Sequence, residues 1–362
     1  MRPAFASTKA AAAFALLLLV VLLLPVLMGE SCLPPREQLY SSAPWGAGAF
    51  PYLHEQIFEE KEDIDIAFMG WSRMWWGIDT QYVQKKLSEK LGRKAVVRTL
   101  GWNSTGFDPL YFIPQDLLRK RKVRMMVFCD LSGGAGDFAH DRAPYWFRLA
   151  DNAEALAGLS VRSKASFYSS AILGMPRNFL CWLRLNLPAI PSDEISWPGF
   201  PHVINPSLRL GSLVLRMRLG QPFTDYTPRT NADPSEVRVY SEATKEHFRF
   251  MGAPLAPMQS AFTRKTAALA REHQVKLVYL HLPTTTEMRS SVVEEPVFWP
   301  DVFNGDVAMM GIPGASLFAG IADEDVQKLY YNFEHFNKNG QEYFTKIITP
   351  RLMQIYENQS KP

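Results

Sequence analysis

The chain has 362 residues, of which 47% are apolar and 21% are charged, so it can bury a sizeable core and does not have the composition of a disordered protein. Its net charge of +3 is close to balance, and no run of Lys and Arg alternates with aromatic residues, so we expect no nucleic-acid partner. Three cysteines are too few for a disulfide framework or a four-cysteine zinc site, and we expect neither a metal nor a cofactor.

The first distinctive segment is an uncharged apolar stretch at residues 10–29, which follows Arg2 and Lys9. About 20 apolar residues match the hydrocarbon thickness of a bilayer, so residues 1–30 are predicted to be a transmembrane signal anchor. Positive charge on the short side predicts a cytoplasmic N-terminus and a periplasmic or extracellular main domain. A cleaved signal peptide is the alternative, and it leaves the domain on the same side of the membrane.

Residues 31–63 are rich in Pro, Gly and Ser and are predicted to be a linker and approach segment, whereas residues 64–357 alternate apolar runs with amphipathic segments. The expected strands cover residues 64–69, 95–100, 123–129 and 275–282. The expected helices cover residues 79–91, a short segment closing at 116–121, 258–273, and 337–356 with a bend or break near Pro350. Continuous apolar strands between helices predict an α/β domain with a doubly wound, flavodoxin-like parallel sheet.

An insertion at about residues 140–255 interrupts this alternation. It is aromatic and rich in Pro, and Lys and Arg outnumber Asp and Glu in most of it. Two interpretations remain open for this helical or irregular segment. It lies on the membrane surface or grips a membrane partner, or it is an ordinary helical cap over the functional site.

Two residues at opposite ends of the alternating region have the setting of a nucleophile and its base. Ser72 follows the first strand directly, where functional groups gather in doubly wound sheets. His335 lies in a polar loop after the fourth strand and before the last helix, which places it at the same edge of the sheet. Because a nucleophilic serine needs a base within hydrogen-bond reach, we expect the two residues to meet in one site.

The motifs around these residues resemble those of the SGNH (GDSL-like) hydrolase superfamily, particularly its membrane-anchored bacterial branch associated with O-acylation of cell-surface polymers. Family members open with a strand followed by Gly-x-Ser, and this chain has Gly70-Trp71-Ser72-Arg73, continued by Gly77-Ile78-Asp79. They close with Asp-x-x-His-Leu-Asn-x-x-Gly, and residues 332–340 here are Asn-Phe-Glu-His-Phe-Asn-Lys-Asn-Gly. The resemblance covers about residues 65–350 and implies an SGNH-type domain.

The resemblance implies a role for each matched residue. Ser72 would be the nucleophile and one oxyanion-hole donor, His335 the base, and Gly101, after the second strand, another oxyanion-hole donor. The family's third donor is an asparagine after the third strand. The segment that begins at Asp130 has none, and Asn103 is the candidate to replace it.

Three further residues are candidates for substrate binding. Arg73 either contacts an anionic group of the substrate or forms a structural salt bridge. Trp71, with its neighbouring tryptophans, either stacks on sugar rings or packs beneath the insertion. Asp130 follows the third strand, at the edge of the sheet where Ser72 is expected.

The main departure from the family pattern is Asn332, which stands where the family has aspartate. An asparagine can orient the histidine through its carbonyl oxygen but cannot stabilise an imidazolium with full charge. Three hypotheses follow. The site works as a Ser-His dyad that Asn332 orients, another carboxylate such as Glu334 or Asp130 supplies the charge, or the site has become a binding or scaffold site.

These residues predict an extracytoplasmic serine esterase or O-acyltransferase, with acetyl as the expected acyl group. The resemblance implies a cell-envelope or secreted polysaccharide as the glycan partner, and a multi-pass membrane acyltransferase as a plausible donor partner. The alternative is a catalytically impaired SGNH-like domain that binds glycan or organises an envelope complex.

Overall fold

The structure is a computed structural model that describes residues 6–27, 37, 40, 50–102, 106–129, 156–165, 167–169, 228, 232–250, 256–295 and 307–359. Most of the predicted linker and of the insertion at 140–255 lies outside these residues. The same holds for two candidate site residues, Asn103 and Asp130.

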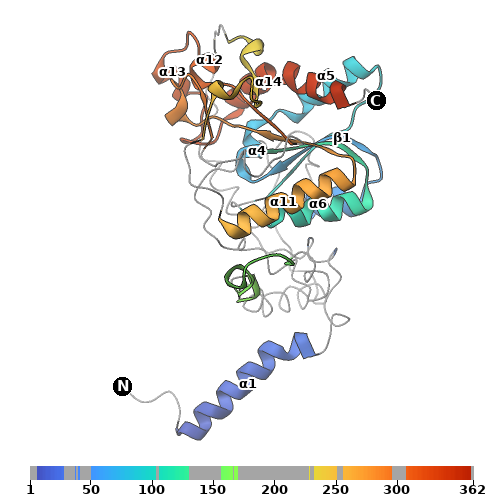
Figure 1. The fold of residues 1–362 in the computed structure, drawn as a ribbon, viewed down its shortest axis with the longest axis vertical. Helices are drawn as coiled ribbons and strands as arrows, with labels where there is room; N and C mark the ends of the chain where they lie inside the picture. The colour runs from blue at the N-terminus through green and yellow to red at the C-terminus, as the bar shows by residue number, and fades with distance from the viewer. Residues whose placement is uncertain are drawn as a thin grey trace, which may run out of the picture.

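A six-stranded sheet with the spatial order β2-β1-β3-β6-β8-β4 forms the centre of the domain (Figure 1). Five strands run parallel: β1 (Ile64–Gly70), β2 (Val97–Gly101), β3 (Val123–Cys129), β6 (Lys276–Leu280) and β8 (Val307–Gly311). Their order is the 2-1-3-4-5 order of a flavodoxin-like sheet, with the topological switch point beside β1. β4 (Arg238–Val239) adds an antiparallel edge, and β5 (Phe248–Phe250) pairs with β7 (Val293–Glu295) in a small second sheet.

Helices cover both faces of the sheet. In Figure 1, α5 (Thr80–Leu91) and α14 (Lys338–Gln359) pack together on one face, and α6 (Pro109–Lys120) and α11 (Pro257–Glu272) pack together on the other. Every residue of β1 is buried between these layers. The predicted α/β class with a mostly parallel, doubly wound sheet is therefore confirmed.

The remaining helices are short and lie around the sheet. The α-helices among them are α3 (Phe50–His54), α4 (Ser72–Gly77), α12 (Gly314–Leu317) and α13 (Asp323–Gln327). A π-helical turn and three 3₁₀ turns complete the described part: η2 (Glu55–Glu59), η3 (Pro234–Glu236), η4 (Lys245–His247) and η5 (Thr285–Glu287).

Local sequence signals explain the ends of α5. The Asp79 side chain accepts a hydrogen bond from the backbone N–H of Tyr82 at 3.1 Å, which satisfies one free donor of the first turn. Gly92 ends the helix in a left-handed conformation, with φ of 65°, that glycine adopts without steric cost. Leu87 and Val83 face the sheet and are fully buried.

The sequence prediction was incomplete at two places. The fifth parallel strand, β8, was not foreseen, because its five residues follow a segment without periodic pattern. The C-terminal helix was expected to be interrupted or bent near Pro350; α14 includes this proline and runs on to Gln359, so the helix is not interrupted there.

The N-terminal helix α1 spans Thr8–Leu27. Its described apolar side chains from Leu16 to Val20 are each 42–63% exposed. Within the described residues, no helix meets the length and apolarity that a membrane crossing requires.

Candidate active site

The structure brings Ser72 and His335 into direct contact. Ser72 Oγ lies 2.8 Å from His335 Nε2, although the two residues are 263 positions apart in the chain. Both side chains are partly exposed, so a small molecule can reach them. The distance is that of a hydrogen bond between a nucleophile and its general base.

Asn332 fixes the protonation pattern of this pair. Its Oδ1 accepts hydrogen bonds from the backbone N–H groups of Glu334, at 3.0 Å, and His335, at 2.9 Å. Backbone N–H groups can only donate, so the atom facing them is the amide oxygen. The same Oδ1 lies 3.0 Å from His335 Nδ1, which must therefore carry a proton. In the neutral imidazole, Nε2 then presents its lone pair to Ser72 Oγ.

A carboxylate also lies close to the base. Glu334 Oε1 is 3.7 Å from His335 Nδ1, beyond hydrogen-bond distance but close enough for electrostatic attraction. The side chain is one-third exposed, so solvent screens the interaction. Asn332 therefore supplies the hydrogen bond that a family aspartate would make, and Glu334 supplies a nearby negative charge.

Ser72 is held at the switch point by the helix that it begins. It is the first residue of α4, directly beyond the end of β1. The C-terminal end of α4 is tied to the first turns of α14. Gln341 Nε2 donates to the carbonyls of Trp75 and Ile78, both at 2.9 Å. Because α14 follows the His335 loop, these bonds connect the segment of the nucleophile to that of the base. Sequence reasoning did not identify Gln341, although it stands directly after the motif at 332–340.

The end of the family-like motif has a structural explanation. Asn337 Oδ1 accepts from Gly340 N at 3.1 Å, and its Nδ2 donates to Lys328 O at 2.6 Å, so Asn337 begins α14 and anchors it to the preceding turn. A Cβ at Gly340 would overlap the carbonyl oxygen of Leu329. Glycine is therefore required where α14 approaches this backbone.

Gly101, the predicted oxyanion donor, lies at the required edge of the sheet. It ends β2 and stands level with Gly70, two residues before Ser72. A Cβ at this position would overlap the indole ring of Trp75, so only glycine fits between β2 and α4. This placement is compatible with the oxyanion role that the resemblance implies.

The two described candidates for substrate binding are buried. Arg73 is 4% exposed, and its Nη2 donates to the carbonyl of Leu282. The guanidinium therefore bonds to the backbone inside the domain and does not face a substrate anion. Trp71 is 3% exposed, which corresponds to packing and not to stacking on a sugar. Arg73 lies on α4, which packs against the sheet, and Trp71 directly precedes this helix.

An aromatic pair lines the base on one side. Trp76 stacks on Tyr331 with ring centroids 5.0 Å apart, and its ring lies 5.9 Å from the His335 imidazole. Trp76 is one of the tryptophans considered for sugar stacking, whereas Tyr331 and the contact with the imidazole were not predicted. Among the described residues, no group of three or more His, Cys, Asp or Glu is arranged to hold a metal ion.

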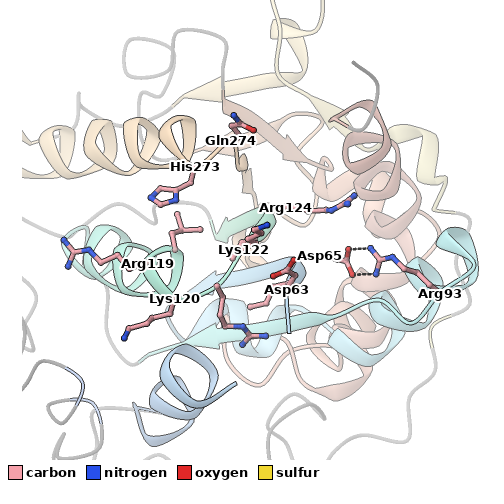
Figure 2. Close-up of a pocket in the computed structure, with 13 residues that line it drawn as sticks. Asp63, Asp65, Arg93, Arg119, Lys120, Lys122, Arg124, His273 and Gln274 are labelled. Atoms are coloured by element: carbon pink, nitrogen blue, oxygen red, sulfur yellow. Dashed lines mark hydrogen bonds and ion pairs between the residues drawn. The ribbon is translucent and has the colours of Figure 1, made fainter. Parts of the chain in front are cut away.

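A cavity of about 1000 Å³ lies at the opposite edge of the sheet, where β1 and β3 begin (Figure 2). Its lining is mostly basic: Arg93, Arg119, Lys120, Arg121, Lys122 and Arg124, with Asp63 and Asp65. Three of the helices that cover the sheet, α5, α6 and α11, end here, and Arg and Lys side chains complement the partial negative charge of helix C-termini. Figure 2 also shows the Asp65 carboxylate paired with Arg93. Ser72 and His335 lie at the other edge of the sheet.

The fold and the contacts define an α/β domain with a Ser-His-Asn constellation at the carboxyl edge of a doubly wound sheet. Comparison of the chain with protein-family models, with curated proteins and with solved structures gave no match.

Proposed function

We propose that the chain is a serine esterase or O-acyltransferase of the SGNH type. The observation that carries this proposal is the hydrogen-bonded series from Ser72 Oγ to His335 Nε2, and from His335 Nδ1 to Asn332 Oδ1. The flavodoxin-like strand order and the position of Ser72 directly after β1 support the same class.

The geometry suits acyl transfer in two steps. Ser72 Oγ attacks the carbonyl carbon of an ester while His335 Nε2 takes the hydroxyl proton, and the N–H groups of Ser72 and Gly101 stabilise the oxyanion. His335 then returns the proton to the departing alcohol oxygen, which leaves an acyl-Ser72 ester. In the second step, His335 takes a proton from water or from a glycan hydroxyl, and that oxygen attacks the acyl carbon. The bond from that carbon to Ser72 Oγ breaks, and His335 returns the proton to the serine oxygen.

The proposal includes location and partners. The apolar, exposed side chains of α1 and the basic flank before it support an anchor at residues 10–29, with the domain outside the cytoplasm. From there the acceptor would be a hydroxyl of a cell-envelope or secreted polysaccharide. A multi-pass membrane acyltransferase is proposed as the partner that delivers the acyl group.

The decisive test is hydrolysis of p-nitrophenyl acetate by the wild-type protein and by Ser72→Ala. We expect the variant to lose turnover by about a thousandfold or more, because no other group at the site can form the acyl intermediate. A fluorophosphonate probe should label the wild-type protein at Ser72 and leave the variant unlabelled. Equal ester hydrolysis by the two folded proteins would disprove the proposal.

One observation favours a second candidate function. The amide of Asn332 is neutral where the family has a carboxylate, as expected of a domain that binds glycan or organises an envelope complex without catalysis. This alternative predicts that wild type and Ser72→Ala bind an envelope polysaccharide equally and that neither reacts with the fluorophosphonate.

A further inference from the structure

One short segment contacts both halves of the candidate active site. The segment follows β6 and contains Leu282 and Pro283. Arg73, the residue after the nucleophile, donates from its guanidinium to the carbonyl of Leu282. The hydroxyl of Tyr330, at the start of the His335 loop, donates to the carbonyl of Pro283 at 2.7 Å.

A third contact reaches the turn that carries the base. Thr285 N donates to the carbonyl of Phe333 at 2.8 Å, and Phe333 lies between Asn332 and His335. The separation of Ser72 Oγ from His335 Nε2 therefore depends on where this segment lies.

A buried group of charges fixes the segment itself. Glu287 accepts a hydrogen bond from His281 Nε2 at 2.6 Å and from Thr284 Oγ1 at 2.7 Å. On the other side of the imidazole, His281 Nδ1 lies 3.7 Å from Glu295 Oε2. His281 and Glu295 are 1% and 0% exposed. Charges this deeply buried are stable only when opposite charges and hydrogen bonds compensate them.

Arg73 belongs to the same electrostatic group. Burial raises the pKa of Glu287, but the charge of His281, hydrogen bonds from His281 and Thr284, and the charge of Arg73 outweigh burial and hold that pKa below its usual value. Glu287 is therefore an anion that attracts both the histidine on its own segment and the arginine beside the nucleophile.

We propose that Arg73, His281 and Glu287 form a positioning cluster that sets the distance between the nucleophile and the base. The inference rests on the proposed function, since it assigns these residues to the same reaction without contact to substrate. Hydrogen-bonded catalytic groups tolerate displacements of only about 0.5 Å, and a shift of about 1 Å costs about a hundredfold in rate. The cluster acts on that distance because it holds residues 282–285, whose backbone contacts both Arg73 and the His335 loop.

The experiment compares two buried acids in the full-length protein. Glu287→Gln keeps the size of the side chain and removes its charge. Asp65→Asn makes the same change at the opposite edge of the sheet, where Asp65 is paired with Arg93. For each variant we would measure kcat and KM with p-nitrophenyl acetate, the rate of Ser72 labelling by a fluorophosphonate, and the thermal midpoint.

We expect Glu287→Gln to lower kcat and the labelling rate by about tenfold to a hundredfold, with KM changed by less than about twofold. Asp65→Asn should lower the thermal midpoint while kcat stays within about twofold of wild type. Arg73→Lys, which keeps the positive charge, should retain more kcat than Arg73→Met.

The inference is overturned if Glu287→Gln and Arg73→Met lose only thermal stability, as Asp65→Asn does, and keep kcat within about twofold. Should Glu287→Gln not fold, the comparison of Arg73→Met with wild type and with Arg73→Lys decides by the same criterion. If wild type neither hydrolyses the ester nor reacts with the probe, the proposed function fails, and the inference fails with it. The two failures are thereby distinguished.

Discussion

At the scale of single residues, Asn332 controls the base without a charge. Its oxygen accepts three hydrogen bonds from the loop that it begins, and this fixes which nitrogen of His335 faces Ser72. A carboxylate at the same position could accept the same three bonds. Asn332 therefore orients the histidine as a carboxylate would, but it lacks the negative charge of a carboxylate.

Replacing Asn332 with aspartate tests that separation. We expect Asn332→Asp to raise kcat for p-nitrophenyl acetate by about tenfold or more, because the carboxylate stabilises the imidazolium that forms as Ser72 attacks. Asn339→Asp adds the same charge in the first turn of α14 and should leave kcat within about twofold of wild type. An unchanged kcat in folded Asn332→Asp would show that charge at this position does not limit the reaction.

Glu334 is expected to contribute modestly and in a salt-dependent way. Its carboxylate is partly exposed and 3.7 Å from Nδ1 of His335. Glu334→Gln should lower kcat by about twofold to fivefold at low salt, and the loss should shrink at high ionic strength, because salt screens partly exposed charges. Steady-state kinetics at two salt concentrations measure this. A loss that does not depend on salt would contradict the electrostatic role.

At the scale of elements, the strands show what sequence can reveal. The long apolar run at Val123–Cys129 was predicted at its observed bounds, since a central parallel strand is buried on both faces and needs no alternation. β8 lacks such a signal, because its five residues include two methionines and a glycine and follow an irregular segment. β8 is a strand because it pairs with β6 and β4, which lie elsewhere in the sequence.

The candidate site, too, was predictable from the sequence only in part. The order of the two motifs and their places after a strand and before a helix were enough to predict that Ser72 and His335 share one edge. The burial of Arg73 was not predictable, because it depends on a carbonyl at Leu282, more than two hundred positions away. Nor did the sequence reveal the stacking of Trp76 on Tyr331, since ring packing depends on side-chain conformation.

The carboxyl of Asp65, at the amino end of β1, is expected to make the stability of the fold depend on pH. Burial raises the pKa of Asp65, at the start of β1, but hydrogen bonds from Arg93, Tyr356 and the N–H of Val96 outweigh burial and lower it below the usual value. A carboxyl with a depressed pKa stabilises the fold above its unfolded pKa of about 3.9, and this stabilisation is lost as the pH falls toward the folded pKa.

Asp65→Asn is therefore expected to lower the free energy of unfolding by about 1–2 kcal/mol at pH 7. The difference between wild type and variant should shrink as the pH falls below about 4, because the carboxyl becomes protonated first in the unfolded chain and then, at lower pH, in the folded protein. Urea unfolding at pH 7 and pH 3.5 measures both quantities. A difference that stays constant between the two pH values would contradict an ionic role for Asp65.

At the scale of the whole molecule, the proposed anchor and the domain make separable contributions. A phosphatase reporter that is active only outside the cytoplasm, fused after the last residue, should be active with the full chain. It should be inactive when residues 1–30 are deleted, because the deleted segment supplies both the apolar stretch and its basic flank.

Ester hydrolysis provides the complementary measurement for this deletion. The variant without residues 1–30 should keep the kcat of the full chain, since the sheet and the Ser72–His335 contact lie beyond residue 63. An active reporter in the deletion variant would contradict the assigned topology, whereas a loss of kcat would show that the first segment supports the domain.

The 263 positions between Ser72 and His335 have a consequence for biosynthesis. Ribosomes add about 5–20 residues per second, so a nascent chain displays its serine long before the histidine has been made. Until the final helix emerges and docks, the serine has no base and remains an ordinary alcohol. Under the proposed function, reactivity arises only after His335 has been translated and α14 has docked.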